Sequence, residues 1–390
     1  MKIYIITTET FPNGLAATQR IRCYAKSVVE LGYECEVLCL NRCEDPSSPL
    51  GNTETKGEID GYSYTYLGSS TYLKKGWRNK VNQLLDTIRL AALILERFHK
   101  RDKVIFYSYN TILRKIVVAL AQLSGFEVYF EMNEHPSIQM SGFRMDDDNP
   151  NDRSRLKKAL KGIDGFLCIS SSLKDLLVRS GIDESKIHVV NMLVDTSRFA
   201  GIEKQNVEPY IGYCGAADNK KDGVDQLIKA FDKIAHKYPN LKLYIMGPKR
   251  EDCKNEELAK KLGIDDRVLF TGMVSSGELP QKLVNARILA LDRPQSKQAK
   301  YGFPTKLGEY LLTGNPVVVT SVGDIPLFLK DCESAYLVEP DNIEEFATKL
   351  DYILSRNEDS RQVGQNGREV ALKHFSGQCL KSQLKIAMNL

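Results

Sequence analysis

The sequence predicts an α/β protein made of two doubly wound, Rossmann-like domains. Three observations support this prediction. Short apolar or β-branched runs alternate with amphipathic segments along the chain, two such series follow one another, and a polar stretch without periodicity separates them. With 390 residues and 42% hydrophobic content, the chain can bury two cores. We expect both domains to face one cleft, because open α/β sheets bind ligands at the carboxyl ends of their strands.

The first series predicts strands at 3–8, 34–40, 104–109, 128–132, 166–170 and 188–190. The second series predicts strands at 210–215, 241–246, 268–271, 288–291, 317–320 and 336–338, and helices such as 225–238 and 344–355 fill the intervals. The predicted linker is 195–209. We therefore place a first domain at 1–198 and a second domain at 199–375, and we expect the final helix, 376–390, to return to the first.

The composition limits the class of protein. A formal net charge of +4, from 54 basic and 50 acidic residues, argues against a nucleic-acid-binding protein. The amino-terminal stretch indicates a first strand rather than a signal peptide, and no apolar run approaches the ~18 residues of a membrane-spanning helix. We expect a cytoplasmic protein whose nine cysteines are reduced, because none of them forms a CxxC pair.

The segment YGFPTKLGEYLLTGNPVVVT, residues 301–320, combines a turn, a short helix and an apolar strand. We expect Thr305 to cap the helix, and helical spacing places Lys306 and Glu309 on one face. Free amides at the helix start together with Lys306 suit a diphosphate, and Glu309 suits ribose hydroxyls. The alternative is an exposed ion pair between Lys306 and Glu309, separated by three residues.

Four segments together resemble the retaining glycosyltransferases of family 4, which have the GT-B fold. They are 10–40, 189–199, 211–231 and 301–320, and they occur in the order that the family shows. The resemblance implies transfer of a sugar from a UDP- or GDP-linked donor to a glycan or lipid-linked acceptor, as in bacterial surface polysaccharide synthesis. It also implies a donor-binding second domain, no metal ion and no cofactor besides the nucleotide-sugar substrate.

The same resemblance assigns candidate site residues. Lys221 would stabilise the leaving diphosphate. His135, with Glu134 second, would lie beside the transferred sugar, and Ala16 and Arg20 would lie on the acceptor side. The donor-binding residues that it implies are Gly14, Gly215, Lys221, Phe303, Pro304, Thr305, Lys306 and Glu309. The alternative for Lys221 is a solvated lysine pair, and that for His135 and Glu134 is a polar loop that caps the next helix. The alternatives for Gly14 and Arg20 are an ordinary turn and a solvated helix face.

Two positions depart from the family pattern. Ala216 stands where an arginine is usual, and Tyr301 stands where a second glutamate is frequent. These departures leave open a catalytically silent subunit that binds nucleotide sugars. An epimerase of the same architecture fits less well, because it needs further acid and base groups.

Two further motifs have two interpretations each. Asp146 and Asp148 have the Asp-x-Asp spacing of manganese-dependent glycosyltransferases of another fold, although a solvated acidic loop fits better. The segment 72–101 combines an amphipathic helix with Lys74, Lys75, Trp77, Arg78 and Lys80 near its start. This composition suits peripheral contact with the anionic inner face of the cytoplasmic membrane. The alternative is a helix that packs on the core and has a solvated basic start.

Overall fold

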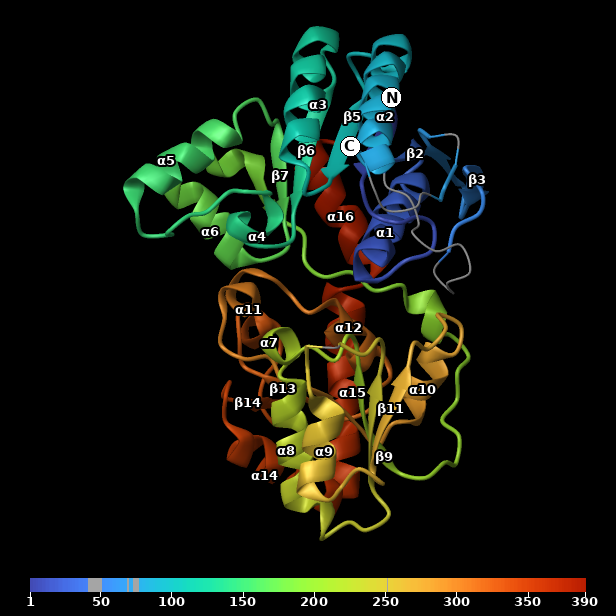
Figure 1. Cartoon of the computed structure of the whole chain (residues 1–390), viewed down its shortest axis with the longest axis vertical. Helices are drawn as coiled ribbons and strands as arrows, with labels where there is room; N and C mark the ends of the chain where they lie inside the picture. The colour runs from blue at the N-terminus through green and yellow to red at the C-terminus, as the bar shows by residue number, and fades with distance from the viewer. Residues whose placement is uncertain (41–50, 69, 73–76, 251) are drawn as a thin grey trace. The chain divides into compact units, whose positions relative to one another are not determined.

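The computed structural model describes residues 1–40, 51–68, 70–72, 77–250 and 252–390, without the side chains of 77–79 and 357. The chain divides into two compact units. The N-terminal unit comprises Met1–Leu193 and Gly377–Leu390, and the C-terminal unit comprises Val194–Ser376. The last helix, α16 (Gly377–Met388), packs on α1 (Ala16–Glu30) and buries Leu380 and Leu384, so the chain ends in the unit where it begins (Figure 1).

The N-terminal unit contains an eight-stranded sheet with the order β3-β4-β2-β1-β5-β6-β7-β8. Its strands are β1 (Lys2–Thr7), β2 (Glu34–Cys39), β3 (Lys56–Ile59), β4 (Tyr62–Tyr66), β5 (Lys103–Tyr107), β6 (Glu127–Met132), β7 (Gly165–Cys168) and β8 (Ile187–Val189). All pairs are parallel except β3 with β4.

The hairpin of β3 and β4 was not expected from the sequence. Its turn residues, Asp60 and Gly61, both have positive φ, at 50° and 84°. An Asp-Gly pair between two strands is a strong signal for a two-residue hairpin, because the turn twists in the same sense as the strands. The sequence therefore carried the signal for this hairpin.

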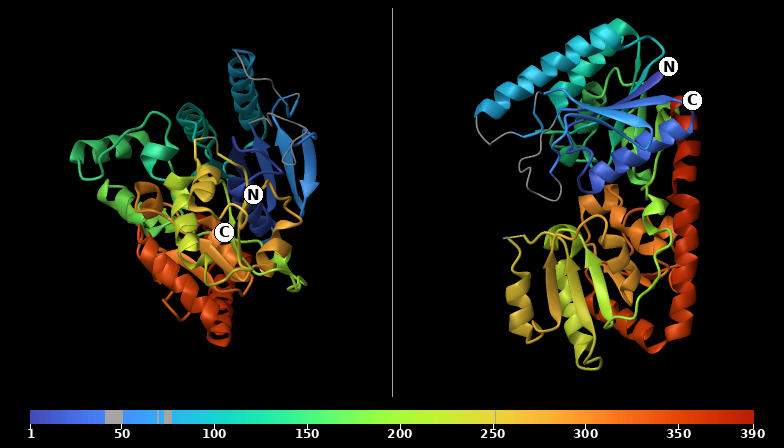
Figure 2. Two further views of the ribbon diagram at one scale, coloured as in Figure 1. Left: turned by 60° about the horizontal axis from the view of Figure 1, so that its bottom comes forward. Right: turned by 90° about the vertical axis from the view of Figure 1, so that its right-hand side faces the viewer.

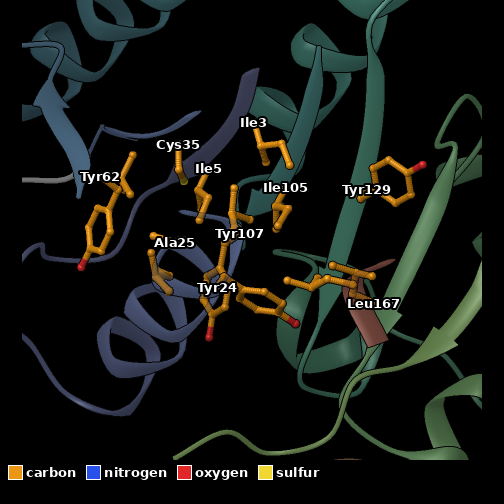
Figure 3. Packing of buried hydrophobic residues seen from close by; sticks show 14 of the residues in the cluster. Ile3, Ile5, Tyr24, Ala25, Cys35, Tyr62, Ile105, Tyr107, Tyr129 and Leu167 are labelled. Atoms are coloured by element: carbon orange, nitrogen blue, oxygen red, sulfur yellow. The ribbon is translucent and has the colours of Figure 1, made fainter. Parts of the chain in front are cut away.

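Helices cover the N-terminal sheet, and buried hydrophobic side chains fill the space between them and its strands. Besides α1 and α16 they are α2 (Trp77–Arg97), α3 (Thr111–Ser124), α4 (Pro136–Gln139), α5 (Pro150–Ala159) and α6 (Ser171–Arg179). Side chains of α1 meet those of β1 and β5, among them Tyr24, Ile5 and Tyr107 (Figure 3). α2 is a long helix at the outside of this unit (Figure 2) and packs beside α3.

The C-terminal unit contains a six-stranded parallel sheet with the order β11-β10-β9-β12-β13-β14. Its strands are β9 (Tyr210–Cys214), β10 (Lys242–Met246), β11 (Val268–Gly272), β12 (Ile288–Leu291), β13 (Val317–Thr320) and β14 (Tyr336–Val338). Its helices are α7 (Asn219–Asp222), α8 (Val224–Ala235), α9 (Asn255–Leu262), α10 (Leu279–Asn285), α11 (Lys297–Tyr301), α12 (Thr305–Leu312), α13 (Ile325–Phe328), α14 (Ile343–Ser355) and α15 (Asn357–His374).

Each sheet has a point where the strand order reverses. In the N-terminal unit β1 lies between β2 and β5, and in the C-terminal unit β9 lies between β10 and β12. At such a switch point the loops leave two adjacent strands in opposite directions and open a crevice, which is where ligands of these sheets bind. The loops after β1 and β5, and those after β9 and β12, are therefore the places to examine.

Candidate functional site

The loop after β9 contains a glycine that no other residue could replace without rearrangement. Gly215 has φ 151°, and a Cβ added there would meet Lys306 Nζ at 2.3 Å. Gly247, at the end of β10, is equally constrained, because a Cβ there would meet the carbonyl oxygen of Gly215 at 2.1 Å. The backbones of Gly215 and Gly247 therefore approach each other closely. Because Gly215 has no side chain, the space next to it is open to a basic side chain.

A lysine from α12 fills that room. Lys306 Nζ donates to Asp222 Oδ2 at 2.5 Å and to the hydroxyl of Tyr213 at 3.1 Å, and it lies 4.6 Å from the centre of the Tyr213 ring. Burial alone would raise the pKa of Asp222, but Lys306 next to it keeps that pKa below its usual value. The Lys306 side chain is 17% exposed, so part of this positioned lysine reaches the surface at the switch point of the C-terminal sheet.

Lys221 lies in the same loop region, in α7, and is exposed, as is Lys220. The backbone amides of both lysines donate to Asp218 Oδ1, at 2.9 Å for Lys220 and 3.1 Å for Lys221. The Asp218 carboxylate thus accepts the hydrogen bonds of these two amides, so they are not free to bind a ligand. Any positive charge that α7 offers to a ligand must come from the lysine side chains.

The start of α12 differs by one residue from the sequence expectation. Thr305 was expected to cap the helix, but Pro304 is the N-cap and Thr305 is the first helical residue, without a side-chain cap. Proline has no amide hydrogen, so it is well suited to that boundary. The ring of Phe303 packs against those of Phe328 and Phe375, at centroid distances of 5.9 and 5.6 Å, and so anchors the turn to the core.

Glu309 forms an ion pair that the sequence analysis did not anticipate. Its carboxylate accepts a hydrogen bond from Arg198 of the 3₁₀ helix η2 (Thr196–Phe199), and Arg198 also donates to the carbonyl of Ser276 at 3.3 Å. Burial raises the pKa of Glu309, while Arg198 opposes that rise. The alternative of a Lys306–Glu309 pair is wrong, because each residue has a different partner. Arg198 lies in the predicted linker, where no periodicity marked it.

The two departures from the family pattern have different surroundings. Tyr301, where a second glutamate is frequent, is fully buried. Ala216 is half-buried, and its carbonyl oxygen lies 2.7 Å from the Tyr213 hydroxyl. Neither residue contributes a charge at this edge of the sheet.

His135 was expected beside the transferred sugar, in a loop that faces the cleft, and the structure instead buries it. Its side chain is fully buried, Nδ1 accepts from the amide of Ser137 at 3.2 Å, and Nε2 lies 2.8 Å from Asp147 Oδ1. Because Nδ1 accepts, Nε2 carries the hydrogen and donates it to Asp147. The imidazole therefore caps α4 and fixes the loop after β6, which also holds the half-buried Glu134.

Arg20 was expected on the acceptor side or on a solvated helix face, but the structure buries it. Arg20 is 2% exposed, donates to Glu131 Oε1 at 2.6 Å, and donates to the carbonyls of Asn191 and Val190 at 2.6 Å each. Burial made it unavailable to a ligand. Gly14 is required where it stands, since a Cβ would meet Thr18 Oγ1 at 1.9 Å, and Ala16 is exposed at the start of α1.

The acidic side chains at 146 and 148 contact neighbouring groups of the N-terminal unit. Asp146 Oδ1 accepts from the amide of Asp148 at 3.2 Å, and Asp148 lies 3.5 Å from Arg179. Among the described residues, no three His, Cys, Asp or Glu side chains are arranged to hold a metal ion. In that same part of the chain, no helix is long and apolar enough to cross a bilayer.

Comparison with known protein families places a sequence match on the C-terminal unit. Residues 195–370 match the family described as glycosyl transferases group 1. An MMP alpha-(1->4)-mannosyltransferase from Mycolicibacterium hassiacum is 28% identical over 229 residues, which are 58% of this chain and 54% of that protein. A phosphatidylinositol N-acetylglucosaminyltransferase subunit from Arabidopsis thaliana is 23% identical over 87% of this chain and 72% of its own length. The match to the first relative thus spans about half of its length.

Solved structures resemble the whole chain. A sucrose-phosphate synthase from Thermosynechococcus elongatus superposes with a TM-score of 0.76 at 16% identity, covering 100% of this chain and 98% of that one. Anabaena HepE in complex with UDP superposes with a TM-score of 0.71 at 12% identity, covering 100% of both chains. The protein therefore has the GT-B fold, and its C-terminal unit has the sequence pattern of glycosyl transferases group 1.

Proposed function

We propose that this protein is a retaining glycosyltransferase that moves a sugar from a nucleotide-diphosphate donor to a glycan or lipid-linked acceptor. The observation that carries the proposal is the cluster around Gly215, where Lys306 is held by Asp222 and Tyr213 at the switch point of the C-terminal sheet. A fixed ammonium next to the uncapped start of α12 suits a diphosphate, whose negative charge grows as the sugar leaves.

The nucleoside would bind next to this cluster, with Glu309 accepting hydrogen bonds from the ribose. Glu309 lies one helical turn after Lys306, so one short helix would serve both the phosphates and the ribose. The relative whose structure contains UDP makes uridine the first base to test, with guanosine as the alternative. Surface polysaccharide or related glycoconjugate synthesis would use such a reaction.

Lys221 would supply the second positive charge that Ala216 does not. Its exposed side chain is on the same loop as Gly215 and can move toward a bound diphosphate. Glu134, on the loop that His135 fixes, is the candidate for contact with the transferred sugar. His135 itself would act by positioning that loop. With these cations we propose transfer without a metal ion.

The test uses the full-length protein with a panel of UDP- and GDP-sugars. Calorimetry measures binding of each donor, and release of the nucleoside diphosphate measures hydrolysis or transfer, in EDTA and then with Mn²⁺. We expect micromolar binding of one donor and turnover in EDTA. Absence of binding for every donor would refute the proposal, and activity that requires Mn²⁺ would refute metal independence.

A catalytically silent subunit is the second candidate function, and Ala216 together with the buried Tyr301 favours it. Such a protein would bind the donor as tightly as an enzyme but would release no diphosphate. The same experiment separates the two functions. Introducing the missing charge with Ala216→Arg would raise turnover in a weak enzyme and would leave a silent subunit silent.

We further propose that α2 makes peripheral contact with an anionic membrane. Five large apolar side chains of α2 are 41 to 62% exposed: Val81, Leu84, Leu85, Ile88 and Leu95. At roughly 100° per residue they fall within one stripe about 100° wide, opposite the buried Leu90 and Ile94. We call these five residues the α2 stripe.

Basic side chains accompany the α2 stripe. By the same spacing, Lys80 and Arg89 are exposed within roughly 40° of the two edges of the stripe, and the exposed Glu96 lies beside one edge. Arg97 is exposed on the opposite face, and Lys100 and Arg101 are exposed after the end of the helix. An apolar stripe flanked by basic side chains suits anionic lipid head groups. Near the start of this segment, Lys74 and Lys75 lie outside the described residues, and so do the side chains of Trp77 and Arg78.

A further inference from the structure

Three basic side chains lie at the amino edge of the C-terminal sheet. Arg287 comes directly before β12, and its backbone amide donates to the carbonyl of Tyr210, the first residue of β9, at 2.8 Å. Lys204 lies on the connection between η2 and β9, and Arg361 lies near the start of α15. We call Lys204, Arg287 and Arg361 the basic cluster. Because all strands of this sheet are parallel, its amino edge is opposite to the edge that holds Lys306.

Hydrogen bonds hold the ammonium group of Lys204 in place. Its Nζ donates to the carbonyl oxygen of Ala286 at 2.8 Å and to Oδ1 of Asn315 at 2.9 Å. Asn315 is itself buried, and its Nδ2 donates to the carbonyls of Leu283 and Val284 at 3.0 and 2.9 Å. An ammonium group has three N–H donors, so these two bonds leave one N–H of Lys204 for another acceptor.

The backbone that carries Lys204 is also fixed, because it is bonded to α10 on both sides of this residue (Figure 1). The carbonyl of Glu203 accepts from Nε2 of Gln281 at 2.9 Å, and the amide of Gln205 donates to Oδ1 of Asn285 at 2.9 Å. A ligand that binds Lys204 therefore meets a side chain that is already ordered. Binding to a preorganised group loses little conformational entropy.

The helix α15 brings Arg361 to the same edge of the sheet. Gly364 packs so closely on the turn before β13 that a Cβ there would meet the carbonyl oxygen of Gly314 at 2.3 Å. Gln365, which helical spacing places on the same face of α15 as Arg361, lies 3.5 Å from that carbonyl oxygen. The face of α15 that carries Arg361 therefore borders the turn to which Lys204 is bonded.

No carboxylate of the described residues offsets the charges of the basic cluster. Loss of water around the ammonium, together with the charges of Arg287 and Arg361, lowers the pKa of Lys204 to about 8. Loss of water and the charge of Arg361 also lower the pKa of Arg287. The three cations thus repel one another, and an anion bound among them would relieve this repulsion.

The composition of the basic cluster selects the chemistry of that anion. Two guanidinium groups can each form a pair of hydrogen bonds with phosphate oxygens, and an ammonium group adds a compact charge. A phosphate group carries a charge of about −1.5 to −2 at pH 7, so it offsets more of the repulsion among three cations than a carboxylate does. Lys204 and Arg361 are exposed and Arg287 is half-buried, so an anion can reach the cluster from solvent.

We propose that the basic cluster is a binding site for a phosphate group, separate from the site at Lys306 where the nucleotide-sugar donor is proposed to bind. Lys204 and Arg287 bind the phosphate oxygens at the edge of the sheet, and Arg361 binds them from α15. The proposal does not depend on the proposed function, because the two sites lie at opposite edges of the sheet. Soluble metabolites and lipid head groups both carry phosphate, and the experiment separates these two sources.

The experiment follows phosphate binding by NMR of the full-length protein labelled with ¹³C at the Cε atoms of its lysines. The variant Lys204→Met assigns the Lys204 signal. The soluble probes are inorganic phosphate, pyrophosphate and glycerol 3-phosphate, titrated with and without UDP and also in Lys306→Met, so that binding at the opposite edge of the sheet is recognised. The lipid probe is sedimentation with phosphatidylcholine vesicles that contain or lack phosphatidic acid.

Two variants test the arginines of the cluster, Arg287→Gln and Arg361→Gln. The matched control is Arg368→Gln, which removes an exposed arginine about two turns farther along α15. All variants are compared with the parent in both the NMR titration and the vesicle assay. Thermal unfolding of each variant checks that the fold is kept.

We expect phosphate and pyrophosphate to shift the Lys204 signal and to raise the pKa of Lys204, because a bound anion favours the ammonium form. The affinity should fall about tenfold in Arg287→Gln and in Arg361→Gln, as for loss of a hydrogen bond to a charged group. It should be unchanged in Arg368→Gln. Without phosphate, the two cluster variants should unfold at no lower temperature than the parent, because each removes repulsion between cations.

Three outcomes would overturn the proposal: no soluble probe shifts the Lys204 signal, the shift is lost with UDP or in Lys306→Met, or the two cluster variants bind phosphate as tightly as Arg368→Gln does. The vesicle assay then identifies the source of the phosphate. A loss of sedimentation with phosphatidic acid in both cluster variants, but not in the control, assigns the site to a lipid head group. Equal sedimentation of all variants assigns it to a soluble phosphate compound.

Discussion

Both units use ion pairs at the carboxyl ends of their sheets, but solvent reaches them differently. In the N-terminal unit Arg20 and Glu131 are 2% and 0% exposed. In the C-terminal unit Arg198 and Glu309 are 18% exposed each, and Lys306 is 17% exposed beside Asp222. The same kinds of side chain therefore serve two purposes. A sealed pair ties the sheet to α1 and the chain at 190–191, whereas a pair that reaches solvent can exchange its partner for a ligand.

The largest effect is expected on stability, from Arg20→Met. This change leaves the buried Glu131 without its cation and also removes hydrogen bonds to two carbonyls, so the free energy of unfolding should fall by ~3 to 5 kcal/mol. Urea denaturation measures it. UDP binding below the unfolding transition should be unchanged, and a specific loss of UDP binding by a fully folded variant would contradict the structural role.

A smaller loss is expected in turnover, from Lys306→Met. Removing one positioned cation from the diphosphate site should lower turnover by ~10² to 10³. Because Asp222 would then be buried without a cation, the double variant Lys306→Met with Asp222→Asn should regain stability but not activity. Lys330→Met, at an exposed position away from the switch point, is the matched control. Full activity in the double variant would remove Lys306 from the site.

Lys221→Ala tests the exposed cation of the same site. Turnover should fall by about 10², and donor affinity should fall less, because the charge matters most as the bond to the sugar breaks. Lys220→Ala, its exposed neighbour, is the control. Equal kinetics for the Lys221 variant and the parent would assign the leaving group to Lys306 alone.

Glu309 and Arg198 give a pH-dependent test. Glu309→Gln should weaken donor binding by ~1 to 3 kcal/mol. The pKa of Glu309 in the folded protein is raised above its ordinary value of 4.5. Between the pKa of the unfolded chain and that of the folded protein, the folded protein holds a proton that the unfolded chain releases. The free energy of unfolding therefore falls as pH rises through this range.

Donor affinity should instead rise with pH, because the carboxylate is the form that accepts from ribose. Arg198 lowers the pKa of Glu309 and Asp195 raises it, so Arg198→Met should move the midpoint of the affinity profile to higher pH. Calorimetry between about pH 4.5 and 8 follows the shift. An unchanged midpoint would show that Arg198 does not act through Glu309.

The smallest effect is expected at the α2 stripe. Leu84→Ser with Ile88→Ser should reduce sedimentation with phosphatidylglycerol vesicles about tenfold, through lost apolar contact. The control is Leu123→Ser on α3, which is 79% exposed but lies outside the stripe. Equal loss with both variants, or no binding by the parent, would contradict a membrane face on α2.

Much of the fold was predictable from local pattern. All twelve predicted strands occur, because a buried parallel strand needs a continuous apolar run, and that need is visible in segments such as NPVVVT. The hairpin at Asp60 and Gly61 was missed although its turn signal was present. Lys306 and Glu309 were also accessible to sequence reasoning, because helical spacing relates them to each other.

The sequence by itself determined the two α/β series, the glycine at 215 and the short helix with its lysine and glutamate. Only the tertiary structure decided which charges meet. Asp222 is 84 residues from Lys306 and Arg198 is 111 from Glu309, so no local periodicity could pair them. It also decided burial. An arginine on an amphipathic helix can face water or a carboxylate in the core, and for Arg20 the outcome depended on Glu131, which lies on another element 111 residues away.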